Sequence, residues 1–111
     1  MGIPAAIIYM NGLIDEARRY AKRGLLTFAF GKYEEAKGVL GYIENQWREE
    51  KVVLSHEDEF ALDVVRERLA VGFSALTNGG SPGLHGVKRA SKDDFRDAVE
   101  NAIKELSAMF Q

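Results

Sequence analysis

Residues 33–47 read YEEAKGVLGYIENQW, and this stretch decides the fold. Its apolar side chains Tyr33, Ala36, Leu40, Ile43 and Trp47 recur at steps of three and four residues. That spacing places them on one face of an α-helix, while Lys and Glu fill the remaining positions. We therefore predict a helix over about residues 33–50 whose apolar face packs against an antiparallel neighbour.

The preceding segment predicts a helix over about residues 4–30. Pro4 suits a first helical turn, and apolar residues from Leu13 to Phe28 recur at helical spacing. After the central stretch, Ser55 is followed three residues later by Asp58, a pattern that resembles a capping box. It predicts a third helix over about residues 56–78.

The third helix has a wide apolar face. Its main stripe consists of Leu62, Val65, Leu69, Gly72, Phe73 and Leu76, and Phe60, Val64 and Val71 widen it. Residues 79–90 are rich in glycine and predict a flexible loop, followed by a helix over about residues 92–110. The predicted fold is all-α, with three to four antiparallel helices in a single domain over residues 1–111.

Composition narrows the classes of function. The chain has 111 residues and no cysteine, which excludes disulfides, thiolate zinc sites and cysteine nucleophiles. The formal net charge of -2 does not favour nucleic acid or anionic membranes as partners. The apolar start, residues 1–10, is too short to span a bilayer. We expect a soluble cytoplasmic protein with no cofactor and no contact with a membrane.

Six residues between Tyr20 and Ile43 stand at the spacing of a known repeat pattern: Tyr20, Gly24, Gly31, Tyr33, Ala36 and Leu40. The segment resembles a single tetratricopeptide helical hairpin. The resemblance implies that Gly24 permits close helix packing and that Gly31 ends the first helix. It also implies a scaffold that binds other proteins and performs no chemistry.

Four residues of the central helix are candidates for contact with a partner: Gly38, Gly41, Tyr42 and Trp47. Glycine within a helix costs roughly 1 kcal/mol relative to alanine, so two glycines one turn apart indicate close approach of another helix. That helix belongs either to the same chain or to a partner. Tyr42 lies off the main apolar seam and would add an aromatic contact. The leading hypothesis is a non-catalytic interaction or assembly module that forms a homodimer.

The alternative hypothesis is a nucleic-acid-associated protein. Arg18, Arg19, Lys22 and Arg23 cluster opposite the apolar stripe of the first helix, where they could contact phosphates. A solvated helix face explains the same charges, and no aromatic side chain lies among them to stack on a base.

Two further clusters bear on catalysis and metal binding. The acidic run that follows His56 is explained by helix capping, because consecutive helical residues cannot converge on one ion. The glycine-rich loop with His85 could cradle a phosphate, which leaves an enzyme or cofactor-binding protein as a third hypothesis. The loop lacks the Walker pattern, and no catalytic triad is supported by spacing. We therefore predict no catalytic residue and no metal ligand.

Overall fold

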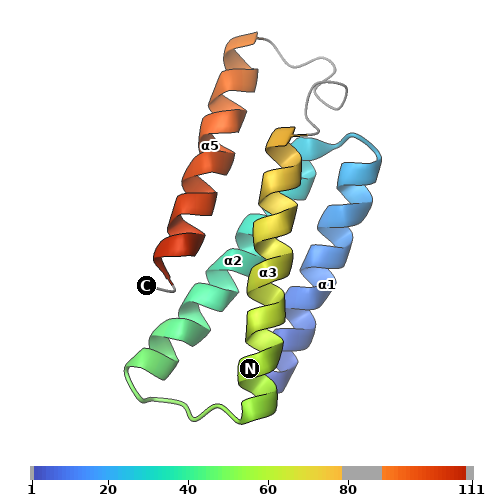
Figure 1. The fold of residues 1–111 in the computed structure, drawn as a ribbon. Helices are drawn as coiled ribbons and strands as arrows, with labels where there is room; N and C mark the ends of the chain where they lie inside the picture. The colour runs from blue at the N-terminus through green and yellow to red at the C-terminus, as the bar shows by residue number, and fades with distance from the viewer. Residues whose placement is uncertain (1, 79–88, 110–111) are drawn as a thin grey trace.

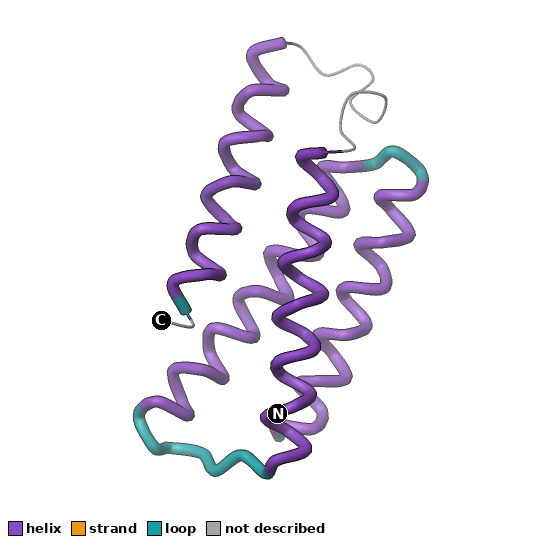
Figure 2. The backbone as a smooth tube through the Cα atoms, in the orientation of Figure 1, coloured by secondary structure: helices purple, strands orange, loops and turns teal. Residues whose placement is uncertain are grey.

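The computed structural model describes residues 2–78 and 89–109, which form an antiparallel bundle of α-helices (Figure 1). The helices are α1 (Ile3–Lys22), α2 (Leu26–Arg48), α3 (His56–Asn78) and α5 (Arg89–Ala108). They run alternately up and down, and Figure 2 shows no strand among the described residues. The predicted all-α fold class is confirmed.

The central pair of helices is α2 and α3. Helix α1 packs against both of them, most extensively against α2, whereas α5 packs mainly against α3. In Figure 1, α1 and α5 accordingly lie on opposite flanks of the bundle. This arrangement leaves one surface between α1 and α2 and another between α1 and α3.

The core is built from one stripe of each helix. The largest fully buried side chains are Phe73, Met10, Ile14, Leu40, Ile43, Leu69, Val65 and Val99. Phe73 packs edge-on against Phe30 at a ring-centroid distance of 5.9 Å. Phe73 also packs against Tyr33, at a ring-centroid distance of 5.6 Å. Aromatic packing between α2 and α3 therefore fills the middle of the bundle.

The first turn lies earlier than the sequence predicts. Helix α1 ends at Lys22, so the predicted helix over residues 4–30 is wrong, and α2 begins at Leu26 rather than at residue 33. Gly24 has a φ of 76°, and its amide donates to the carbonyl of Ala21 at 3.0 Å. The Leu25 amide donates to the carbonyl of Tyr20, also at 3.0 Å. These two bonds form a Schellman motif, in which the positive φ of Gly24 ends α1.

Gly31 does not end a helix. It lies within α2, and a Cβ added there would meet no heavy atom within 4 Å. The resemblance to a tetratricopeptide hairpin stays a prediction, but the turn of this hairpin lies seven residues before the position that the resemblance implies.

We expect Gly24→Ala to destabilise the protein by about 1–2 kcal/mol, because an L side chain at positive φ clashes with its own backbone. Gly31→Ala is the matched control and should stabilise the protein by about 0.5–1 kcal/mol through helix propensity. Urea denaturation of both variants measures the difference. A Gly24→Ala protein as stable as the control would contradict the Schellman turn.

The remaining helices differ from prediction in smaller ways. Helix α3 has the predicted bounds, and Ser55 Oγ accepts a hydrogen bond from the Asp58 amide at 3.1 Å. Helix α5 begins at Arg89 and ends at Ala108, so the predicted range of 92–110 is shifted. The predicted loop over 79–90 lies outside the described residues except for its last two positions, which are helical.

A buried lysine links α2 to α5. The side chain of Lys37 is 6% exposed, and its Nζ lies 3.1 Å from Glu34 Oε2 and within hydrogen-bond distance of Glu105 Oε2. Burial lowers the pKa of Lys37, but the hydrogen bonds to Glu105 and Glu34 outweigh it, so the net pKa is raised. The cation is therefore held charged between two carboxylates, one from each helix.

Candidate protein-interaction surfaces

The first candidate surface is a hollow between α1 and α2 of about 520 Å³, which we call the aromatic groove. Helix α1 contributes Ile3, Ala6 and Tyr9, and helix α2 contributes chiefly Gly38, Val39 and Tyr42. Tyr42 is 66% exposed and Tyr9 is 41% exposed. Two aromatic side chains thus stand beside an apolar hollow that the bundle itself does not fill.

The aromatic groove is almost uncharged. Glu35 is the one ionisable acid or base among its lining residues besides the two tyrosines, and it accepts a hydrogen bond from the Tyr9 hydroxyl at 3.0 Å. That hydrogen bond raises the pKa of Tyr9. The surface therefore presents two tyrosine side chains and one carboxylate that already has a partner.

The four predicted contact residues do not share one surface. Gly38 and Tyr42 both line the aromatic groove, and a Cβ added at Gly38 would meet no atom within 4 Å. A Cβ added at Gly41 would lie 3.2 Å from Cε of Met109, so Gly41 serves packing within the chain. Trp47 is 41% exposed and lines a separate hollow beside the α2–α3 connection.

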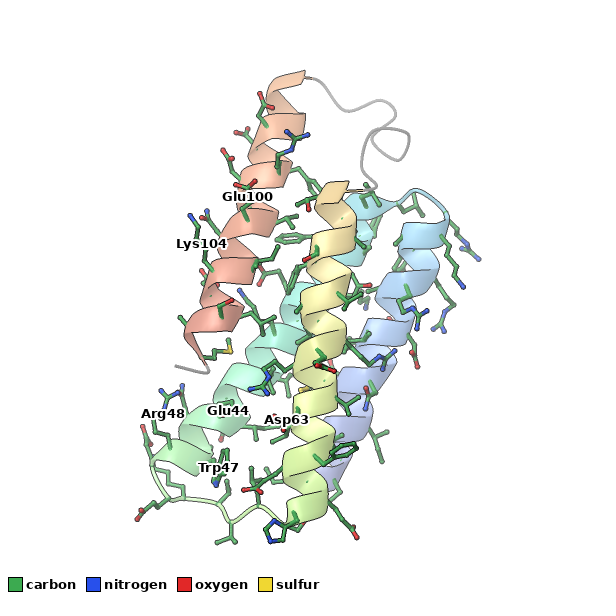
Figure 3. All side chains as sticks on the ribbon, viewed as in Figure 1. Glu44, Trp47, Arg48, Asp63, Glu100 and Lys104 are labelled. Carbon is green, nitrogen blue, oxygen red and sulfur yellow. The ribbon has the colours of Figure 1, made fainter. Side chains whose placement is uncertain are left out.

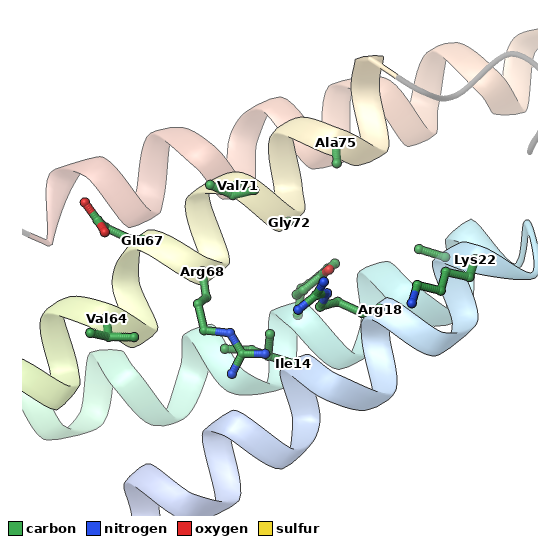
Figure 4. Close-up of a pocket in the computed structure, with 11 residues that line it drawn as sticks. Ile14, Arg18, Lys22, Val64, Glu67, Arg68, Val71, Gly72 and Ala75 are labelled. Carbon is green, nitrogen blue, oxygen red and sulfur yellow. The ribbon is translucent and has the colours of Figure 1, made fainter.

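The second candidate surface is a hollow of about 500 Å³ between α1 and α3, which we call the basic groove (Figure 4). Its apolar lining comprises Ile14, Ala21, Tyr33, Val64, Val71, Gly72 and Ala75, and its charged lining comprises Arg18, Lys22, Glu67 and Arg68. Three cations face one carboxylate. Figure 4 shows Arg18 and Arg68 projecting between the two helices from opposite walls.

The floor of the basic groove is formed by Tyr33 of α2. Its ring lies directly against the backbone of Gly72, where an added Cβ would be only 2.5 Å from Cε1 and Cζ. Burial raises the pKa of the Tyr33 hydroxyl, while Arg18 and Arg68 oppose that shift. The two arginines are therefore close enough to the floor to act on charge placed there.

The cations of the groove differ in their partners. Arg68 donates to Asn11 Oδ1 and to Asp15 Oδ1, both at 2.6 Å, so its guanidinium is fixed against α1. Arg18 and Lys22 make no ion pair within 4 Å in the part of the chain that the structure describes. Of the predicted basic face, Arg18 and Lys22 line the groove, whereas Arg19 and Arg23 do not.

The sequence pattern does not predict this groove, because part of its lining reads as core. Phe60, Val64 and Val71 are 71%, 38% and 70% exposed, so the prediction that they widen the buried stripe is wrong. They follow one another on the outer side of α3, since α5 covers a different side of that helix. Successive members of this set are four and seven residues apart, a spacing that places them on one face of α3 distinct from the buried stripe.

A third cluster of charges joins α2 to α3. Figure 3 labels Glu44, Arg48 and Asp63, which lie near the lower end of the bundle in that view. Burial raises the pKa of Glu44, and Arg66 and Arg48 oppose the shift. Arg66 Nη2 also lies 2.8 Å from Asp63 Oδ1. Each carboxylate here has a nearby arginine, which is the arrangement of a surface ion-pair network.

The acidic start of α3 contains a histidine that is exposed to solvent. His56 is exposed, and its Nδ1 lies 3.5 Å from Glu59 Oε2. Among the described residues, no group of three or more His, Asp or Glu side chains is placed to hold a metal ion. The predicted phosphate cradle with His85 lies outside the described residues. None of the described helices is long and apolar enough to cross a membrane.

Comparison with known proteins identifies no similar protein. The chain matches no protein-family model, no curated protein and no solved structure.

Proposed function

We propose that this protein is a non-catalytic interaction module that self-associates through the aromatic groove. The observation that carries the proposal is Tyr42, a large aromatic side chain that is 66% exposed beside an apolar, nearly uncharged hollow. Tyrosine is enriched at the centres of interfaces, where charged residues are depleted. The resemblance to tetratricopeptide hairpins, which bind proteins, supports the same class of function.

Charge favours a second copy of the chain as the occupant. A twofold dimer places each patch against an identical patch, so a charged patch would meet its own charge. The aromatic groove avoids this repulsion because its one carboxylate, Glu35, is engaged by Tyr9. The basic groove, with three cations and one carboxylate, would repel its own copy across such an axis.

The expected result for Tyr42→Asp is loss of the dimer. An aromatic side chain at an interface centre contributes about 2 kcal/mol or more on truncation, so the dissociation constant should rise about thirtyfold. Light scattering coupled to size exclusion, over a range of protein concentrations, measures the change. The exposed side chain of Tyr42 makes no contribution to the core, so the variant should fold like the wild type.

Phe60→Asp is the matched control, because Phe60 is a 71% exposed aromatic residue on the outer side of α3. We expect it to leave the dimer intact at low and at high salt. A monomeric wild type, or an equal loss of dimer in both variants, would refute self-association through the aromatic groove.

A further inference from the structure

We propose that the basic groove binds an acidic amphipathic helix of a partner protein. This site is separate from the aromatic groove, and the inference does not rest on self-association. Two features occur together on this surface. Exposed aliphatic side chains continue from an apolar floor, and cations without ion-pair partners in the described chain stand along one wall.

The shape of the apolar surface fits a helix. Phe60, Val64, Val71 and Ala75 follow one another along the outer side of α3. From residue 60 to residue 75 there are 15 residue steps, which correspond to about 22 Å or four helical turns. Helix α1 forms the opposite wall, as Figure 4 shows. A guest helix that lies between them would present apolar residues at intervals of three and four to this floor.

The charges select an acidic guest. Arg18 and Lys22 are one turn apart on the α1 wall and are exposed, so both can pair with carboxylates of a bound segment. Arg68 on the α3 wall is already paired with Asp15, so the preference for an acidic guest rests on Arg18 and Lys22. A basic or neutral helix of the same shape would leave these cations facing an apolar surface without partners, which costs desolvation energy.

The chain itself offers no matching guest. Segment 79–88 contains Lys88 and no acidic residue, so its charge has the wrong sign. Helix α5 is acidic, but Val99, Ala102 and Leu106 of its apolar face are buried in the core. A separate protein with glutamates or aspartates beside its apolar stripe satisfies both requirements of the groove.

The test uses two synthetic helical peptides that share leucines at every third and fourth position and differ only in Glu or Lys at the flanking positions. Each is titrated to millimolar concentration into isotope-labelled protein, and amide chemical shifts are followed. The acidic peptide should shift residues of α1 and α3 around the basic groove and should bind less tightly as salt rises. The Lys peptide should not bind.

Two double variants separate the groove from its surroundings. Arg18→Glu with Lys22→Glu should weaken binding of the acidic peptide about tenfold or more, since two pairing charges are reversed. Arg19→Glu with Arg23→Glu changes the net charge by the same amount on the neighbouring stripe of α1. This control should weaken binding of the acidic peptide only about twofold. Val71→Asp, at a 70% exposed position, should also abolish the groove shifts without unfolding the protein.

Several results would overturn the proposal. They are equal binding of both peptides, equal loss in the two double variants, or no shift at millimolar acidic peptide. A single-stranded oligonucleotide that binds wild type and loses affinity equally in both double variants would instead indicate the nucleic-acid alternative of Arg18, Arg19, Lys22 and Arg23. The titration is repeated in the Tyr42→Asp background, so failure of groove binding is distinguished from failure of self-association.

Discussion

Replacing Gly72 by alanine is expected to destabilise the bundle by about 1–3 kcal/mol, even though alanine is the better helix former. The new Cβ would lie 2.5 Å from two ring carbons of Tyr33, a distance that packed atoms do not tolerate. The Tyr33 ring is 3% exposed and packs against Phe73, which is fully buried. Relief of the clash therefore requires either that the ring leaves its contact with Phe73 and shifts toward the basic groove or that α2 separates from α3, and both changes cost packing energy.

Urea denaturation of Gly72→Ala and of Gly38→Ala provides the comparison. Gly38 also lies within a helix, but nothing stands within 4 Å of an added Cβ, so Gly38→Ala should gain about 0.5–1 kcal/mol. The cause is tested by a double-mutant cycle with Tyr33→Leu. Removing the ring should relieve the clash, so the double variant should lose at least about 1 kcal/mol less than the sum of its single variants. Additive losses would show that the ring is not the obstacle.

The close contact at Gly72 also shows how far a sequence predicts this fold. Apolar spacing correctly assigns Gly72, Phe73 and Leu76 to the buried stripe of α3, because helical periodicity follows directly from the pattern. It does not reveal that Tyr33 lies against Gly72, because the register between α2 and α3 depends on packing of the whole core.

The position of the first turn shows a different limit. Gly24 and Gly31 are both glycines near apolar residues, and the repeat pattern favours Gly31 as the helix end. The structure uses Gly24, which follows Arg19 and Lys22 in the last turn of α1. Basic residues favour a helix C-terminus because they offset its partial negative charge. That local signal was available in the sequence, but it carried less weight than the spacing of the pattern.

The candidate surfaces were predictable only in part. Tyr42 is exposed, as its position off the apolar seam indicates, whereas Gly41 is occupied by Met109 from the far end of the chain. A contact over that sequence separation leaves no periodic trace. The basic groove depends on the absence of a covering helix over Val64 and Val71, and no local pattern specifies which side of α3 receives α5.

The second large effect is expected for Lys37→Glu, which should destabilise the protein by about 3 kcal/mol or more. The Lys37 side chain is 6% exposed and lies between Glu34 and Glu105. Reversal of its charge would place a third carboxylate among two others at a site with little access to water. Lys37→Met should cost less, about 1–2 kcal/mol, because Glu34 and Glu105 are 35% and 65% exposed and stay hydrated without the lysine.

The pH dependence of stability provides an independent check on the same contact. Because the folded-state pKa of Lys37 is raised, its contribution is fully present below the ordinary lysine pKa of about 10.4 and is lost as pH rises through the raised value. Wild type should therefore lose stability in that alkaline range more steeply than Lys37→Met. Burial also raises the pKa of Tyr33, which adds to the loss in both proteins alike and does not alter the comparison.

Charge exchange distinguishes the ion pair from simple packing. If the attraction between α2 and α5 depends on opposite charges, adding Glu105→Lys to Lys37→Glu should restore a large part of the lost stability, since the new lysine again faces a carboxylate. Glu105→Lys alone should be destabilising, because it places two cations together. Urea denaturation of the four proteins measures the coupling. Equal losses in Lys37→Glu and in the exchanged protein would mean that Lys37 acts through its buried alkyl chain, and that α5 is held to α2 by shape alone.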